Sequence, residues 1–405
     1  MLSEVKTVTL KLLAYCRAND WAGYDPYDAL NSRLFTFLPC LDFRFFRLGL
    51  TQLLKRSPVN IRPLLLVPKM QNPKALALFL MALVKLSRLG LLEQEDLIKY
   101  MVERLVALRS AGTPYWCWGY SFPWQTRTIL VPRWAPNLVC TTFVANALLD
   151  AHEKSGEGKF LDMAVSAARY ISDELYWTDG TGTACLAYPV PTSRARVHNA
   201  NLLGAALLCR VYKEAGDKKF LDPALEVARY SGAKQRDDGS WDYGEDSTQR
   251  WIDNFHTGYN LCALRSIGRY ADTSEFESHV LRGFAFYRRH FFTDDCAPRY
   301  FHDRTYPIDV HSVAQSIVTL ITLKDLDAGN VEVASRVLEW AMTRLWDERG
   351  HFYYQALPWG ITKVPYMRWS QAWMLYALAT LLEASRDTSP ASSLGHKMTR
   401  TTEHR

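Results

Sequence analysis

Three histidines occupy the same position in successive segments of this chain of 405 residues. His198, His256 and His311 each begin an apolar stretch, and Trp369 takes the equivalent place in the next segment. Histidine accepts or donates a proton near neutral pH, so the repeated position, together with Tyr259, favours proton-transfer chemistry at one shared site. A histidine at the start of a helix can equally be a cap or a core residue, and repeats also carry copies that have no function.

Carboxylates beside the same positions form a second set of candidate catalytic residues. Asp242 and Glu245 follow a tryptophan, and Asp253 and Asp309 come shortly before two of the histidines. Hydrolysis of a glycosidic bond needs one protonated and one ionised carboxyl group, which these acids could supply. Asp253 and Asp309 are equally well placed to cap helix N-termini. Three imidazoles could ligate zinc, but helix starts around a wide funnel lie far apart, so we predict no metal and no other cofactor.

Aromatic residues and arginines in the loops form a set of candidate binding residues. Aromatic residues make up 13% of the chain, and the stretch 114–136 is dense in them. Indole and phenol rings stack on the apolar faces of sugars, and arginine makes paired hydrogen bonds to carboxylate or phosphate. Core packing accounts for part of the aromatic set, and surface loops carry arginines in any case. The predicted substrate-binding residues are Trp116, Trp118, Trp124, Arg127, Arg133, Trp134, Arg196, Trp241, Arg250, Arg368 and Trp369.

An internal repeat predicts the elements that position these residues. The segments 156–170 (GEGKFLDMAVSAARY) and 216–230 (GDKKFLDPALEVARY) are identical at nine of fifteen positions. An apolar helix precedes each copy and a polar, aromatic loop follows it, and about six such helical hairpins succeed one another from Pro73 onward. Six hairpins can close into a ring with apolar inner helices and amphipathic outer helices. The alternative architecture is an open solenoid.

These patterns predict an all-α fold, an (α/α)6 toroid with an N-terminal helical extension. Residues 1–62 are expected to form that extension, packed on the toroid, residues 63–385 the toroid itself, and residues 386–405 a disordered tail. The net charge of +6, with basic residues spread along the chain, is too small to indicate nucleic acid binding. Eight cysteines without a CxxC pair indicate a reducing compartment. The apolar run 75–84 is too short to span a bilayer, so a cytoplasmic protein without membrane insertion is expected.

The hairpin count, the aromatic loops and the apolar inner helices over Pro73–Ser385 resemble the six-hairpin glycosidase-like superfamily. That resemblance implies a glycoside hydrolase, or an epimerase or lyase that acts on a sugar or uronate. The stretches GYDPYDALNS (residues 23–32) and KRSPVNIR (residues 55–62) resemble uncharacterised bacterial proteins found with polysaccharide-biosynthesis genes. This second resemblance implies a part in exopolysaccharide or surface-polysaccharide biosynthesis.

Two other functions remain open at this stage. One is a non-catalytic toroid that binds a glycan or a partner protein, which needs the aromatic loops but not the histidines. The other is a toroid similar to terpene cyclases, because the stretch QRDDGSW at residues 235–241 resembles the QW motif of those enzymes. That motif occurs once, without a DxDD acid motif, and the terpene-cyclase alternative predicts a dry, apolar funnel. The leading expectation is a sugar or polysaccharide substrate, and the oligomeric state is not predicted.

Overall fold

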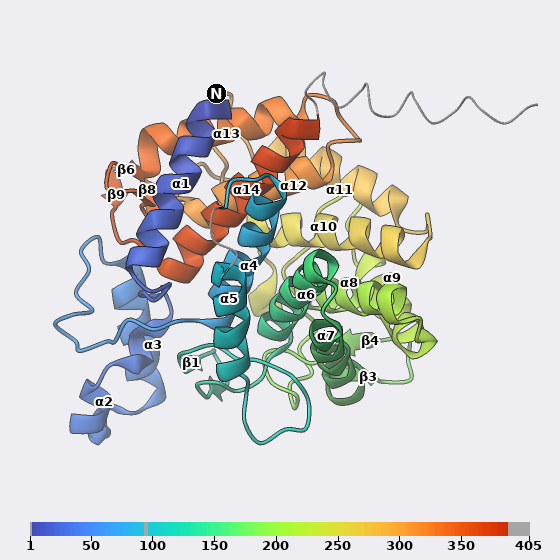
Figure 1. Cartoon of the computed structure of the whole chain (residues 1–405). Coiled ribbons are helices and arrows are strands. Elements are labelled where there is room, and N and C mark those ends of the chain that lie inside the picture. The colour runs from blue at the N-terminus through green and yellow to red at the C-terminus, as the bar shows by residue number, and fades with distance from the viewer. Residues whose placement is uncertain (1, 93–95, 388–405) are drawn as a thin grey trace, which may run out of the picture.

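Six helices form a closed inner ring, as the hairpin count predicts. The computed structural model describes residues 2–92 and 96–387. Consecutive inner helices pack against one another and the last packs against the first, so the ring closes (Figure 1). The all-α (α/α)6 toroid is therefore confirmed, and the open solenoid is excluded. The inner helices are α4 (Pro73–Arg88), α6 (Leu138–Ser155), α8 (His198–Ala215), α10 (Asn254–Ala271), α12 (Val310–Thr322) and α14 (Trp373–Asp387), with a π-helical turn η6 (Met367–Ala372) before α14.

Six further helices form the outer layer, and each packs mainly against one inner helix. The partner of α14 comes from the other end of the chain, because α1 packs against α14 where the ring closes. Residues 1–62, predicted to form an extension, therefore divide into α1, which lies in the outer layer, and a segment that starts at residue 19. The outer helices are α1 (Leu2–Ala18), α5 (Asp96–Ala107), α7 (Gly158–Tyr170), α9 (Leu221–Gly232), α11 (Glu277–His290) and α13 (Asn330–Leu345).

Burial distinguishes the two layers. In α12 every residue from Val310 to Ile321 is buried, including its serines, threonine and glutamine. In α11 burial is confined to five residues of one face, from Val280 to Tyr287. A helix with one apolar stripe covers a core, whereas a helix that is apolar on all sides lies within it. The sequence periodicity therefore assigned inner and outer helices to their layers.

The internal repeat corresponds to the turns and outer helices of two consecutive hairpins. Helix α6 ends at Gly156 and α8 at Gly216, both in the left-handed region with φ of 73° and 71°. Glycine adopts this conformation without strain, and it terminates a helix by turning the chain back. The fourth position after each glycine is a buried phenylalanine, Phe160 in the first turn of α7 and Phe220 in the turn directly before α9. The repeated residues are thus those that make the turn and anchor it.

Short strands lie in the loops that lead from an outer helix to the next inner helix, at the end of the ring where inner helices begin. They form three two-stranded hairpins or pairs, β1–β2, β3–β4 and β6–β7, and one three-stranded sheet in the order β5-β8-β9. All the pairings are antiparallel. The strands are β1 (Trp124–Gln125), β2 (Leu130–Val131), β3 (Tyr176–Thr178), β4 (Ala184–Leu186), β5 (Ile308–Asp309), β6 (Trp346–Asp347), β7 (His351–Phe352), β8 (Gln355–Leu357) and β9 (Gly360–Thr362).

Two expectations concern the ends of the chain and membranes. Of the predicted disordered tail, residues 386 and 387 belong to α14, and residues 388–405 lie outside the described part of the chain. Within the described residues, no helix has both the length and the apolar character needed to cross a bilayer.

Candidate functional site

Two aspartates begin inner helices and also hold functional side chains. Asp253 caps α10 by accepting the backbone N–H of His256 at 2.9 Å, and Asp309 caps α12 by accepting that of His311 at 2.7 Å. Such a cap stabilises a helix by about 1 kcal/mol. A carboxylate offers two oxygens with several acceptor sites, so each acid can bind a side chain as well. Asp253 and Asp309 can therefore each cap a helix and hold a functional side chain at the same time.

His256 is held by Asp253 and lies against two aromatic rings. Its Nδ1 lies 2.7 Å from Asp253 Oδ2, and the indole N–H of Trp251 donates to the same oxygen at 3.0 Å. The ring of Tyr243 stacks on Trp251 at 4.5 Å between centroids and lies 4.6 Å from the imidazole. With Nδ1 directed at the carboxylate, Nε2 is the ring nitrogen left to accept a proton.

His311 lies at the same end of the ring and is enclosed by other side chains. Its Nε2 is 2.6 Å from the hydroxyl oxygen of Tyr259. Burial, followed by the nearby cations Lys74 and Arg368, holds the pKa of His311 well below its ordinary value, so the imidazole is neutral at pH 7. The ring of Tyr259 lies 5.9 Å from that of His256 and 6.0 Å from that of His311. Tyr259 thus connects two of the three predicted histidines.

Asp309 has an altered acidity because it is buried. The indole N–H of Trp369 contacts its two oxygens at 2.9 and 3.0 Å. Burial raises the pKa of Asp309 to about 7, although these hydrogen bonds favour the ionised form. The ring of Trp369 in turn lies 5.6 Å from Tyr27, whose hydroxyl accepts a hydrogen bond from Lys55 at 2.9 Å. Asp309 is therefore a carboxyl group that is partly protonated near neutral pH, as a general acid must be.

His198 makes different contacts from the other two histidines. It begins α8, its backbone N–H donates to the carbonyl of Tyr243 at 3.1 Å, and its side chain is buried. Burial lowers the pKa of His198 to about 4, and the acids that act on it are Glu245 and Asp242. Tyr259 links His256 with His311, whereas His198 shares no such ring contact within the described residues, so the meeting of all three at one point stays a prediction.

The other two predicted acids are engaged in surface contacts. Both oxygens of Asp242 bind Arg236 at 2.7 Å. Glu245 binds the hydroxyl of Tyr230 and lies 3.5 Å from Arg196. In the described part of the chain, no three His, Cys, Asp or Glu side chains gather in a way that could hold a metal ion.

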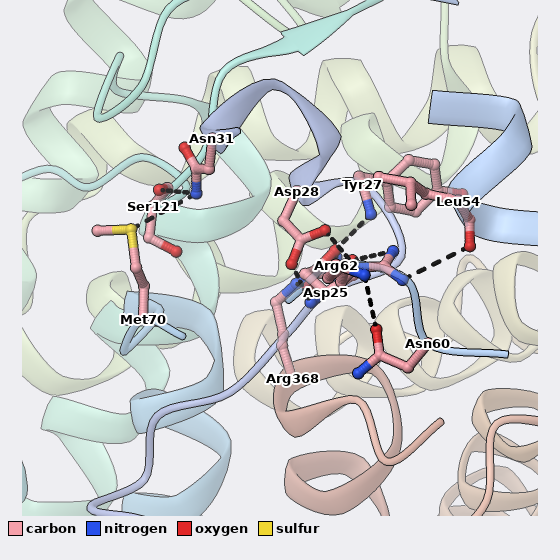
Figure 2. A network of polar contacts seen from close by, with 10 residues as sticks. All are labelled: Asp25, Tyr27, Asp28, Asn31, Leu54, Asn60, Arg62, Met70, Ser121 and Arg368. Carbon is pink, nitrogen blue, oxygen red and sulfur yellow. Dashed lines mark hydrogen bonds and ion pairs between the residues drawn. The ribbon is translucent and has the colours of Figure 1, made fainter. Parts of the chain in front are cut away.

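A segment from residue 19 to residue 72, here called the capping segment, covers this end of the ring. It contains η1 (Asp28–Asn31), α2 (Leu34–Phe37), η2 (Pro39–Leu41) and α3 (Arg44–Arg56). Arg368 binds Asp25 through two hydrogen bonds of 2.6 and 2.8 Å, and Arg62 binds Asp28 at 2.7 Å (Figure 2). All four side chains are buried. The paired Arg368–Asp25 contact is directional and joins the segment to the ring, whereas the Arg62–Asp28 contact lies within the segment and holds its own fold together.

An open cleft of about 900 Å³ lies beside the histidine pair. Its walls are the β1–β2 hairpin, the loop 188–197 and the loop 243–251, and α3 contributes Arg44. Tyr243 and Trp251 line this cleft and also contact His256 and Asp253. Its size falls within the range of small-molecule sites, ~300–1,000 Å³. The aromatic and charged lining residues are Trp124, Trp177, Tyr188, Tyr243, Trp251, Arg44, Arg127, Arg194, Arg196, Asp179, Glu245 and Asp246.

The predicted binding residues divide by their place in the structure. Trp124, Arg127 and Arg196 line the cleft. Trp118 and Trp241 lie in the core, 0% and 2% exposed, and their indole N–H groups donate to backbone carbonyls. For these two the expectation of substrate contact is corrected, because neither ring faces an open space and both fill gaps between helices.

The remaining predicted binding residues are not part of the cleft lining. Arg133 donates to the side chain of Asn31 in the capping segment at 2.7 Å. Arg250 is exposed next to the cleft. Arg368 and Trp369 are buried, and each binds an aspartate. Two tryptophans of the aromatic loop are half-buried, Trp116 and Trp134.

Three polar residues at this end of the ring were not predicted, namely Tyr27, Lys55 and Lys74. Lys74 is buried in the first turn of α4, with its Nζ 4.1 Å from the centre of the Phe143 ring. Burial holds the pKa of Lys74 well below its ordinary value. A lysine at the start of the most apolar stretch of the chain is a signal that could have revealed it. Tyr27 and Lys55 belong to no repeat, so no pattern marks them.

Solved structures of sugar-processing enzymes share this fold. An unsaturated glucuronyl hydrolase specific for heparin matches 95% of this chain and 97% of its own, with a TM-score of 0.60 and 12% identity. The GH76 α-mannanase of Bacteroides thetaiotaomicron matches 78% of this chain and 87% of its own, with a TM-score of 0.61 and 12% identity. The cellobiose 2-epimerase of Spirochaeta thermophila matches 78% and 86%, with a TM-score of 0.58 and 12% identity. No family model and no curated protein matches the sequence.

These likenesses confirm the (α/α)6 toroid fold that the resemblance implied. The alternative of a terpene-cyclase-like toroid required a dry, apolar funnel. The beginnings of the inner helices instead gather charged and ionisable groups, among them Asp309, His311 and Arg368. That arrangement is the opposite of what the terpene-cyclase alternative requires.

Proposed function

We propose that this chain is a carbohydrate-active enzyme that epimerises or isomerises a sugar by proton transfer at the carbon next to the carbonyl group. The observation that carries the proposal is the pair of histidines with separate partners, His256 with Asp253 and His311 with Tyr259. Such a reaction needs one group to remove a proton and another to return one. A part in bacterial exopolysaccharide or surface-polysaccharide biosynthesis belongs to the proposal and rests on the resemblance of residues 23–32 and 55–62.

His256 is the group suited to removing the proton. The carboxylate of Asp253 orients the imidazole through Nδ1 and leaves Nε2 as the nitrogen that can take the proton. As the carbon–hydrogen bond breaks, the proton passes to Nε2 of His256 and the electron pair moves to the carbonyl oxygen, which gives an enediolate. The His311–Tyr259 pair then returns a proton to the sugar, and exchange with water restores both pairs. The ring of Tyr243 lies between the cleft and His256, so it has to turn before the reacting carbon can approach.

The cleft lining indicates the class of sugar. Trp124 and Trp177 offer aromatic faces on which a sugar ring can stack. Arg127 and Arg194 also line the cleft and can bind carboxylate or phosphate through paired hydrogen bonds. Arg196 is engaged with acidic neighbours of its own. A uronate or a sugar phosphate therefore fits this cleft best.

The proposal is tested by proton exchange in deuterated water. The full chain is incubated with a panel of reducing uronates and sugar phosphates, and deuterium at the carbon next to the carbonyl group is measured by NMR. We expect incorporation with one of them, and a loss of at least ~100-fold in the His256→Gln and Asp253→Asn variants. The control is His152→Gln, since His152 lies in the last turn of α6, at the other end of the ring. Equal exchange in the His256→Gln variant and the wild type would refute the proposal.

Asp309 favours glycoside hydrolysis as a second candidate function. Its pKa of about 7, raised by burial, matches the protonated acid that hydrolysis requires. In the same assay hydrolysis releases new reducing ends without deuterium at carbon, so the two reactions are distinguishable. The non-catalytic alternative is favoured if glycan binding and polymer production both survive the double substitution His256→Ala and His311→Ala.

A further inference from the structure

Part of the capping segment forms a lobe beside the ring. Helices α2 and α3 lie together at one side of the molecule, away from the outer helices (Figure 1). This lobe has a small hydrophobic core of its own, formed by Ala29, Leu50 and Leu54. Three buried residues cannot cover the apolar surface that the segment carries, so most of its large side chains remain outside the core.

Exposed apolar side chains are concentrated in this lobe. Eight of the fifteen large hydrophobic residues that are exposed in the described part of the chain lie within residues 33–69. Among them Phe45 is 77% exposed and Leu64 is 81% exposed. Single exposed apolar residues are ordinary, but a concentration on one small lobe marks an interaction surface. The eight residues are Phe37, Leu38, Phe43, Phe45, Leu53, Val59, Leu64 and Leu66.

The same stretch carries the whole excess charge of the protein. Residues 33–69 contain seven arginines and lysines and one aspartate, which is a net charge of +6, and the whole chain has a net charge of +6. The remainder of the chain therefore has equal numbers of basic and acidic residues. Basic residues are spread along the chain as expected, and this stretch differs from the rest because it contains a single acidic residue. Arg33, Arg56 and Lys69 are exposed in the same stretch of the chain.

We infer that residues 33–69 dock this protein on a bilayer surface that contains anionic lipid. Exposed phenylalanine and leucine side chains enter the boundary between headgroups and acyl chains, while flanking arginines and lysines bind the anionic headgroups. A second copy of the chain fits this surface poorly, because two lobes that each carry an excess of basic residues repel one another and interface cores are poor in charged residues. A bilayer supplies both the apolar phase and the opposite charge.

The position of the lobe connects docking with the candidate site. Arg44 of α3 lines the cleft, and its side chain donates to the carbonyl of Arg127 in the β1–β2 turn. Docking therefore places the cleft mouth next to the membrane surface. If the proposed function holds, the substrate class is a saccharide presented at a membrane, such as a lipid-linked sugar. Docking itself does not depend on the proposed reaction.

The experiment is co-sedimentation of the full chain with vesicles of phosphatidylcholine alone and with vesicles of phosphatidylcholine and anionic phosphatidylglycerol, whose negative surface attracts basic side chains. We expect binding to the anionic vesicles that weakens with salt. Arg33→Gln with Arg56→Gln should weaken it roughly fivefold for each charge removed. Phe45→Ser with Leu64→Ser should weaken it by about tenfold or more, because two apolar side chains are lost.

Matched controls carry the same substitutions on other surfaces. Leu281→Ser with Trp359→Ser removes two exposed apolar side chains, and Lys213→Gln with Lys218→Gln removes two exposed charges outside the lobe. Both controls should bind vesicles as the wild type does, and thermal melting confirms that every variant is folded. Unchanged vesicle binding in both lobe variants would overturn the inference. So would a dimer in sedimentation velocity that the lobe variants dissociate, together with no vesicle binding.

Discussion

The substitution Asp25→Asn removes the charge that holds the capping segment on the ring. Arg368 begins the last inner helix and Asp25 lies in the capping segment, and the two side chains are 5% and 7% exposed. Asparagine keeps the shape of the side chain and the oxygen that accepts the backbone N–H of Tyr27. The negative charge is lost together with the second acceptor oxygen, which receives the Arg368 Nε–H at 2.6 Å, so Arg368 is left buried without its counter-ion.

The structure sets the expected size of the effect. Charges about 4 Å apart at an effective dielectric constant of about 20 attract by about 4 kcal/mol. Removing one member of a buried pair typically costs about 3–5 kcal/mol, because the other charge stays desolvated. We expect the free energy of unfolding to fall by that amount. Replacing both members, Asp25→Asn with Arg368→Met, should restore most of it, since no buried charge then remains.

The assay is urea unfolding together with hydrogen exchange of the amides in residues 23–32, which reports release of the capping segment. An exposed pair of the same geometry serves as the control. Arg229 binds Glu275 at 2.7 and 3.0 Å, with side chains 52% and 37% exposed. Glu275→Gln should cost no more than about 1 kcal/mol. The reasoning is refuted if Asp25→Asn costs as little as Glu275→Gln, or if the double substitution is no more stable than Asp25→Asn alone.

Three further predictions concern pH and packing. Because burial lowers the pKa of His198 to about 4, its folded form binds fewer protons than the unfolded chain, and stability is lost as the pH falls from about 6.5 to 4. His198→Gln should reduce this acid destabilisation in unfolding curves measured at pH 7 and 4.5, and equal losses in both proteins would contradict it. Burial raises the pKa of Asp309 to about 7, so the wild type should lose stability relative to Asp309→Asn as the pH rises from about 4 to 7, by up to ~1.4 kcal/mol per pH unit. A difference that does not change with pH would argue against a buried, partly protonated carboxyl group. A Cβ on Gly283 would lie 2.7 Å from the ring of Trp241, so Gly283→Ala should lower the free energy of unfolding by about 1–3 kcal/mol, whereas an unchanged melting curve would show that the ring can move.

Much of the candidate site could be predicted from local patterns, and the rest could not. The sequence predicts Asp253 and Asp309 both as helix caps and as possible acids, because each lies two or three residues before a histidine at the start of an inner helix. The pairing of His311 with Tyr259 spans two hairpins, and no repeat indicates which of three equivalent histidines finds such a partner. The neighbours of each histidine depend on how far apart the starts of the inner helices lie in the closed ring.

The sequence by itself determined the hairpins, their turns and the division into apolar inner and amphipathic outer helices. These features follow from helical periodicity and from residues such as Gly156 and Gly216, which act within a few positions of the chain. Only the tertiary structure decided that α1 completes the outer layer and that Asp25 meets Arg368, 343 residues away. Segments that do not repeat meet where ring closure brings them together. A pattern of a few neighbouring residues cannot predict a contact between positions so far apart in the chain.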